Sequence, residues 1–148
     1  MQPNTAKLEE KFLDGVIEIE NESFAHPWSR EAYLAELKNP MAHYIVLTQE
    51  NTVVAYGGFW QILDEGHITN IAVKKSERGR GLGTVLMRRL LSEAQKLKIT
   101  ALTLEVRASN TAAQHLYQKF GFQSAGIRPG YYPDGESAVI MWREELYC

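Results

Sequence analysis

A run of alternating glycines forms the stretch of this chain best suited to binding an anion. Gly79, Gly81 and Gly83 lie between an apolar, β-branched run at residues 68–73 and a helical pattern that begins at Leu82. The first backbone N–H groups of a helix have no partner within the helix, and the positive end of its dipole lies there. Glycine also lets the main chain approach a ligand closely. The pattern therefore predicts a phosphate-binding turn between a strand and a helix.

Two common phosphate-binding motifs do not fit this turn. A P-loop needs a lysine and then Ser or Thr directly after its last glycine, but Thr84 follows Gly83 with no lysine. The dinucleotide fingerprint places its last two glycines three apart, and no such spacing occurs here. Arg78 and Arg80 add positive charge beside the turn. The alternative is a glycine-rich turn that only begins an ordinary helix.

A second motif runs from residue 104 to residue 122, with the sequence LEVRASNTAA followed by LY and GF. Its first part continues an alternating apolar and polar strand at residues 100–106. Asn110 is expected to cap a helix from Thr111 to about Phe120, and Gly121 is typical of a helix end. This part of the chain is therefore predicted to fold as a strand, a helix and a further strand.

Together the two motifs resemble the GCN5-related N-acetyltransferases, and within them the branch that acetylates protein N-termini. Residues 78–83 resemble the Q/R-x-x-G-x-G/A pyrophosphate loop, and residues 104–122 resemble the second cofactor segment. The resemblance covers nearly the whole chain. It implies an α/β fold of the α+β type in a single domain, residues 1–148. It also implies one mixed, mostly antiparallel sheet with helices on both faces and a splayed strand pair for acetyl-CoA.

The resemblance implies acetyl-CoA as cosubstrate and no metal. Backbone groups of Ile71, Ala72 and Val73 would hold the pantetheine arm, and Asn110 and Tyr117 would also contact the cosubstrate. The pyrophosphate would be held by Arg78, Gly79, Arg80, Gly81, Leu82, Gly83 and Thr84.

The resemblance also assigns catalytic roles, with Glu105 as general base and Tyr117 as general acid. An amine must lose a proton before it attacks a thioester, and the departing thiolate must gain one. A protein α-amine, with a pKa near ~8, is an easier nucleophile at neutral pH than a lysine near ~10.4. An N–H beside Val73 could donate to the developing oxyanion. Glu105 could instead be a solvated edge residue or a partner of Arg107, and Tyr117 could be an ordinary core aromatic.

Three further segments bear on the acceptor. Trp28 in a Pro-Trp-Ser sequence, Arg128, and the pair Tyr131 and Tyr132 in a loop rich in Pro and Gly are candidate walls of a peptide site. With them, the resemblance implies that the acceptor is the N-terminal alanine of a small-subunit ribosomal protein. Trp28 could equally be a packing anchor. A lysine or small-molecule amine as acceptor, or a non-catalytic acyl-CoA-binding module, are the alternatives.

Composition limits the remaining classes of function. The chain has 148 residues and 45% apolar residues, which suits one globular domain. A net charge of −2 argues against direct binding of nucleic acid. Its single cysteine is Cys148, its four histidines lack metal-ligand spacing, and no run is long and apolar enough for a membrane span. We therefore expect a cytoplasmic protein without a membrane partner.

The remaining pattern predicts the elements that position these residues. Helices are expected at residues 12–24, 29–38, 82–98 and 111–120, with Ser29 as a further N-cap. Strands are expected at residues 44–48, 53–63, 68–73, 100–106, 122–127 and 138–142. This order favours a single mixed sheet with helices on its faces.

Overall fold

The computed structural model describes residues 2–146, so Cys148 lies outside the described residues. The described chain divides into two compact units. The first contains the residues up to Trp60 together with Thr69–Ser92, and the second contains Gln61–Ile68 and the residues from Glu93 onward. This division concerns packing, and the expectation of one functional domain over residues 1–148 stays a prediction.

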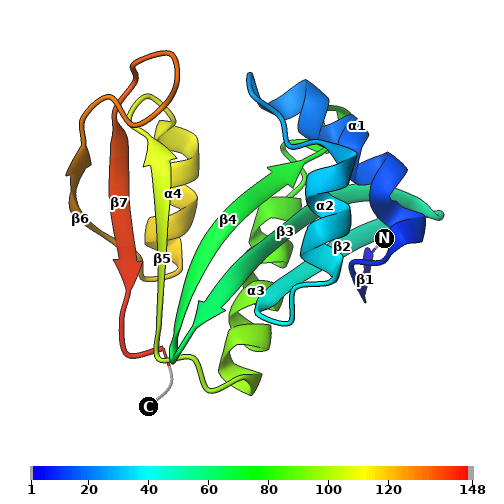
Figure 1. Ribbon diagram of the computed structural model, residues 1–148, viewed down its shortest axis with the longest axis horizontal. Coiled ribbons are helices and arrows are strands. Elements are labelled where there is room, and N and C mark those ends of the chain that lie inside the picture. The colour runs from blue at the N-terminus through cyan, green and yellow to red at the C-terminus, as the bar shows by residue number, and fades with distance from the viewer. Residues whose placement is uncertain (1, 147–148) are drawn as a thin grey trace. The chain divides into compact units, whose positions relative to one another are not determined.

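The strands belong to one seven-stranded sheet in the order β1-β2-β3-β4-β5-β7-β6 (Figure 1). Strands β4 and β5 pair in parallel, whereas β1 with β2, β2 with β3, β5 with β7, and β6 with β7 pair antiparallel. The predicted single mixed sheet is thus confirmed. The strands are β1 (Asn4–Lys7), β2 (Ala42–Gln49), β3 (Thr52–Ile62), β4 (Glu65–Val73), β5 (Ala101–Arg107), β6 (Gln123–Arg128) and β7 (Ala138–Arg143).

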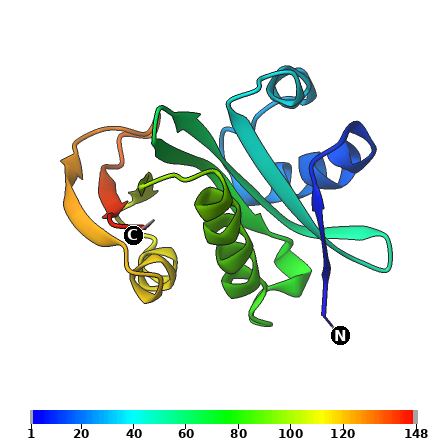
Figure 2. The ribbon, with the colours of Figure 1, turned by 90° about the horizontal axis from the view of Figure 1, so that it is seen from below.

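In the first unit, helices cover both faces of the strands. Tyr56 of β3 packs in one apolar cluster with Val16 and Ile19 of α1 (Leu13–Ser23). At the next residue, Gly57, an added side chain would contact Leu90 of α3 (Leu82–Lys96). Successive strand residues point to opposite faces, so α1 and α3 lie on opposite sides, as Figure 2 shows. The helices are α1 (Leu13–Ser23), α2 (Arg30–Leu37), α3 (Leu82–Lys96) and α4 (Thr111–Lys119), with short 3₁₀ turns η1 (Glu10–Phe12) and η2 (Lys75–Glu77).

In the second unit, α4 lies beside β5 and β7 (Figure 1). Strand β5 alternates as its sequence predicts, so its two sets of side chains point to opposite faces. Leu102, Leu104 and Val106 are buried in the core. Thr103, Glu105 and Arg107 form the other set, and they are half-buried.

Most element boundaries agree with the sequence to within a few residues. Ser29 Oγ accepts from Ala32 N–H and Asn110 Oδ1 accepts from Ala113 N–H, both at 3.1 Å, so both predicted N-caps are confirmed. Gly121 has φ +89°, as a helix end requires. Strand β1 was not predicted, because its side chains are mostly exposed and it joins β2 only through a backbone ladder.

Two further boundaries differ from expectation. Strand β4 begins three residues before the predicted Ile68, where it pairs with β5. Helix α3 ends at Lys96, not at residue 98, since Lys98 has φ +60°. Among the described residues, no helix is both long and apolar enough to cross a membrane.

Candidate active site

The glycine turn lies in the first unit and leads into α3, as predicted. Gly79 and Gly81 have φ of +83° and +80°, a conformation that only glycine adopts easily. A Cβ built on either would meet no described atom within 4 Å, so the turn is open above its main chain. Val85 N–H donates to Gly81 O at 3.2 Å, and the amides that precede Val85 have no acceptor within the helix. This geometry fits a bound phosphate.

The two arginines of the turn are engaged with the protein itself. Arg78 Nε donates to Val73 O and its Nη2 donates to Ser23 Oγ, each at 3.1 Å. Arg80 Nη1 lies 3.1 Å from a carboxylate oxygen of Glu77. Arg78 therefore ties the end of β4 to α1, and part of the expected positive charge of Arg80 is offset by Glu77.

The end of β4 belongs to the same unit as the turn. Ala72 is buried in the apolar cluster beneath α1, while Ile71 and Val73 are half-buried. Directly after the strand, Lys74 N–H donates to Val54 O at 2.8 Å. The three residues expected to hold the pantetheine arm are thus fixed to the neighbouring strand just before the glycine turn.

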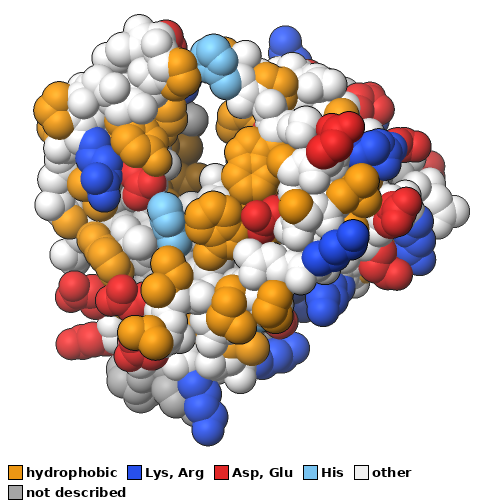
Figure 3. Space-filling view, in the orientation of Figure 1, with side chains coloured by type: hydrophobic (Ala, Val, Ile, Leu, Met, Phe, Trp, Pro, Cys, Tyr) orange, Lys and Arg blue, Asp and Glu red, His pale blue; other side chains and the backbone are white. Residues whose placement is uncertain are grey.

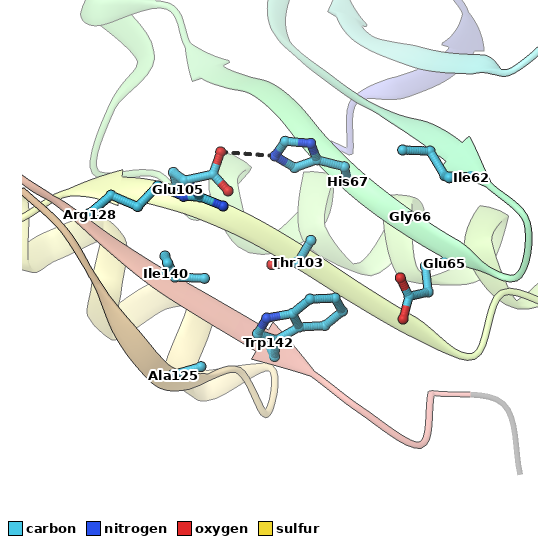
Figure 4. A pocket seen from close by; sticks show the side chains of 10 residues that line it. All are labelled: Ile62, Glu65, Gly66, His67, Thr103, Glu105, Ala125, Arg128, Ile140 and Trp142. Carbon is cyan, nitrogen blue, oxygen red and sulfur yellow. Dashed lines mark hydrogen bonds and ion pairs between the residues drawn. The ribbon is translucent and has the colours of Figure 1, made fainter. Parts of the chain in front are cut away.

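A cleft of about 370 Å³ lies in the second unit, on the face of the sheet to which Glu105 points. Figure 4 shows Glu105 on β5 and His67 on β4 pointing toward each other. The cleft combines apolar walls with a few charged groups, the composition expected of a ligand site. Its lining residues are Ile62, Glu65, Gly66, His67, Thr103, Glu105, Ala125, Arg128, Ile140 and Trp142.

Glu105 is held in place by two hydrogen-bonding partners. Its Oε1 lies 3.0 Å from His67 Nε2 and accepts from Tyr131 OH, also at 3.0 Å. Its side chain is only 10% exposed, so it is not a solvated edge residue. It is not a partner of Arg107 either, because that guanidinium binds Asp134 and Glu136. Both of these hydrogen bonds are made to Oε1.

Tyr117 is buried on α4, and its ring centroid lies 5.9 Å from that of Phe122. Burial raises the pKa of the Tyr117 phenol to about 12. The phenol therefore keeps its proton at neutral pH, as a general acid must. The ring also fills the core, so the packing role and the proposed chemical role are compatible.

The remaining candidates divide between the two units. Asn110 Oδ1 is used in its helix cap in the second unit. Arg128 lines the cleft there, and the exposed Tyr131 makes an edge-to-face contact with Tyr132, with ring centroids 5.1 Å apart. These four residues, with Glu105, therefore belong to one unit.

Trp28, in the first unit, behaves as a packing anchor. Its ring centroid lies 5.2 Å from Tyr33 and 6.4 Å from Trp60. Its backbone N–H donates at 2.8 Å to Glu20, a buried carboxylate that also accepts from Tyr33 OH at 2.8 Å. The packing alternative is thus observed, and a substrate-binding role stays a prediction.

Sequence reasoning missed two residues of the cleft and its surroundings. His67 is not among the site residues predicted from the sequence, yet it contacts Glu105 across 38 residues of sequence. Arg107 enters the sequence analysis only as a possible partner of Glu105. His67 pairs with Thr103 in the parallel β4–β5 ladder, and Thr103 lies two residues from Glu105 on the same face. Only this register, which the sequence pattern does not specify, brings His67 to Glu105.

Surface charge is mixed and agrees with the low net charge. In Figure 3, Lys and Arg side chains alternate with Asp and Glu over the part of the surface formed by α1 and α2. Proteins that bind the nucleic-acid backbone usually carry a clustered basic face. The visible surface over these two helices has no such arrangement.

Comparisons with known proteins agree with this geometry. The model of the acetyltransferase (GNAT) family matches residues 13–122. A protein of Escherichia coli (strain K12), a ribosomal protein bS18-alanine N-acetyltransferase, is 38% identical over 139 residues, which is 92% of this chain and 93% of that protein. A Bacillus subtilis (strain 168) protein, provisionally assigned the same activity, is 46% identical over 132 residues, covering 88% and 87% of the two chains.

Solved structures show the same relationship. The crystal structure of the ribosomal-protein-S18-alanine N-acetyltransferase from Escherichia coli superimposes with a TM-score of 0.89 at 36% identity, covering 97% of this chain and 94% of that one. Ard1 from Thermoplasma volcanium superimposes with a TM-score of 0.91 at 26% identity, covering 97% and 98%. The chain therefore belongs to the acetyltransferase (GNAT) family, whose members take an acetyl group from acetyl-CoA.

Proposed function

We propose that this protein transfers the acetyl group of acetyl-CoA to the α-amine of a protein N-terminus, by direct attack in a ternary complex. The observation that carries the proposal is the Glu105 carboxylate, held through Oε1 by His67 and Tyr131 inside a cleft of about 370 Å³. Such a carboxylate can remove a proton from an amine that enters the cleft. The protein is expected to act in the cytoplasm.

The N-terminal alanine of a small-subunit ribosomal protein is the proposed acceptor. Two relatives with 38% and 46% identity carry a name or provisional assignment with this acceptor. The cleft supports a peptide ligand because Ile62, Ile140 and Trp142 offer apolar surface beside the charged Glu65 and Arg128. An α-amine is also favoured over a lysine, because more of it is unprotonated at neutral pH.

Acetyl-CoA fits the glycine turn of the first unit. The turn is open above Gly79 and Gly81. The first amides of α3, which have no acceptor within the helix, suit a diphosphate. When bound there, acetyl-CoA would supply the activated thioester. The residues of this unit proposed to hold it are Ile71, Ala72, Val73, Arg78, Gly79, Arg80, Gly81, Leu82, Gly83 and Thr84.

Two side chains of the second unit are proposed to move protons. Glu105 accepts one proton as the amine attacks the thioester carbonyl carbon and the new C–N bond forms. Tyr117 donates its phenolic proton to the sulfur as the C–S bond breaks, and a pKa raised to about 12 by burial keeps that proton in place beforehand. Trp28, Arg128, Tyr131 and Tyr132 are proposed to contact the acceptor.

A peptide panel tests the proposal. Release of free thiol from acetyl-CoA is measured with peptides that begin with a free alanine, with the same peptides blocked at the α-amine, and with blocked peptides that carry an internal lysine. We expect thiol release only with the free α-amine. Equal release with the blocked lysine peptide would contradict it and favour the lysine alternative.

A further inference from the structure

The loop between β6 and β7, residues 129–137, contains both tyrosines proposed to contact the acceptor. Two backbone hydrogen bonds shape its tip: Tyr132 N–H donates to Glu136 O at 3.1 Å, and Gly135 N–H donates to Tyr132 O at 2.8 Å. Ordering a surface loop costs conformational entropy, and contacts with the rest of the fold help to hold it in one conformation. Such an anchor is present at the end of β5.

Arg107 joins this loop to β5 by three contacts. Its Nη1 lies 2.8 Å from a carboxylate oxygen of Asp134 and 2.8 Å from one of Glu136. Its guanidinium also lies over the ring of Tyr132, 4.1 Å from the centroid. Glu136 is fixed further, because its second carboxylate oxygen accepts from Ser109 N–H at 2.8 Å. A planar guanidinium can stack on a ring while it donates hydrogen bonds in its own plane, whereas a lysine ammonium is a compact point charge without this fixed geometry.

The contacts continue from this anchor to the proposed base. The Tyr132 ring, held beneath Arg107, packs edge-to-face on Tyr131. Tyr131 in turn donates its hydroxyl to Glu105 Oε1. Arg107 and Glu105 are two residues apart on β5 and therefore point to the same face. One strand thus carries both the carboxylate and the residue that holds a loop over it.

We propose that Arg107 is a positioning residue for the acceptor: it holds residues 129–137 against β5 so that Tyr131 and Tyr132 are set for the incoming peptide. This inference rests on the proposed function. Arg107 contacts neither reacting group in this account. Its role is to reduce the entropy lost when the loop orders around a bound peptide.

The ionic contacts are strongest at a pH at which Arg107, Asp134 and Glu136 are all charged. The Glu136 backbone N–H and the Arg107 guanidinium hold the pKa of Asp134 below its ordinary range, and hydrogen bonds from Ser109 and Arg107 do the same for the pKa of Glu136. Tyr131, whose pKa is raised by burial and by Glu105, is neutral at the same pH. The anchor is therefore fully formed at neutral pH.

Kinetics of Arg107→Gln in the full-length protein test the proposal. We expect the acceptor-peptide KM to rise at least about tenfold from the loss of charge-assisted hydrogen bonds, while the KM for acetyl-CoA stays within about twofold. Arg107→Lys should give an intermediate acceptor KM. Arg89→Gln, an exposed arginine on α3, is the matched control and should change neither KM. If Arg107 were needed only for folding, the variant would contain less active protein, so the apparent kcat would fall and both KM values would stay unchanged. That result would overturn the proposal.

A second readout separates this proposal from the proposed function. Hydrogen exchange of the amides of residues 129–137, measured without substrate, should become faster in Arg107→Gln and stay unchanged in Arg89→Gln. Unchanged exchange, or faster exchange with an unchanged acceptor KM, would overturn the positioning role alone. If the wild-type protein acetylated no peptide, the proposed function would fail and this acceptor role with it. If Arg107→Gln does not fold, Asp134→Asn with Glu136→Gln tests the anchor from the exposed loop, with the same expected rise in acceptor KM.

Discussion

The glycine turn of the first unit and the Glu105 cleft of the second are built from different parts of the chain. The turn consists of main-chain groups contributed by consecutive residues, with Gly79 and Gly81 at positive φ. The cleft consists of side chains, and its central hydrogen bond joins His67 to Glu105 across 38 residues. A site made of main-chain groups can therefore be predicted from a local motif. A site made of side chains depends on the register of strands that are distant in sequence.

The largest expected effect tests the side-chain site. Glu105→Gln keeps the shape of the side chain and removes its basicity, so kcat should fall by at least about a hundredfold, as for loss of a general base. Binding of acetyl-CoA, measured by calorimetry, should stay within about twofold. Near-normal kcat at every pH would remove Glu105 from the reaction and leave the cleft without its proposed role.

The next effect tests the main-chain site. Gly83→Asp places a negative charge at the start of α3, and its repulsion of a bound diphosphate should weaken acetyl-CoA binding about a hundredfold. Gly83→Ala, which adds bulk without charge, is the control and should bind much more tightly than the aspartate variant. Equal affinities of wild type and Gly83→Asp would refute the assignment of the turn to the pyrophosphate.

The two sites also differ in how far the sequence predicted them. The start of α3 at Leu82 and the caps at Ser29 and Asn110 were predicted, because each depends on residues within one turn. The contacts of His67 and Arg107 were not, since their partners come from other segments and nothing local distinguishes these side chains. Strand β1 was missed for a similar reason, as its only signal is the backbone pairing with β2.

A smaller effect is expected at Tyr117, which combines packing with proposed chemistry. Tyr117→Phe keeps the ring that packs on Phe122 and removes the hydroxyl, so kcat should fall about tenfold or more while the thermal midpoint changes little. Since burial raises the pKa of this phenol to about 12, the wild-type kcat should not decline between pH 7 and 9 through loss of the Tyr117 proton. An unchanged kcat in Tyr117→Phe would leave the residue with its core role only.

The smallest effect concerns acid pH and the anchored loop. The pKa values of Asp134 and Glu136 are lowered in the folded state, so their stabilising contribution is present above their ordinary pKa values and is lost as pH falls through the lowered ones. Hydrogen exchange in residues 129–137, corrected for its intrinsic pH dependence, should therefore be constant from pH 6 to 8 and rise only below about pH 4. A rise already between pH 6 and 7 would show that other groups hold the loop.

The site of acetylation on a single peptide shows whether Glu105 drives transfer to a protein α-amine. The peptide begins with a free alanine and carries one internal lysine, and mass spectrometry locates the acetyl group after reaction with wild type and with Glu105→Gln. We expect acetylation of the alanine α-amine alone, with a rate that falls at least about a hundredfold in the variant. Acetyl groups on the lysine, or equal rates for the two proteins, would contradict it.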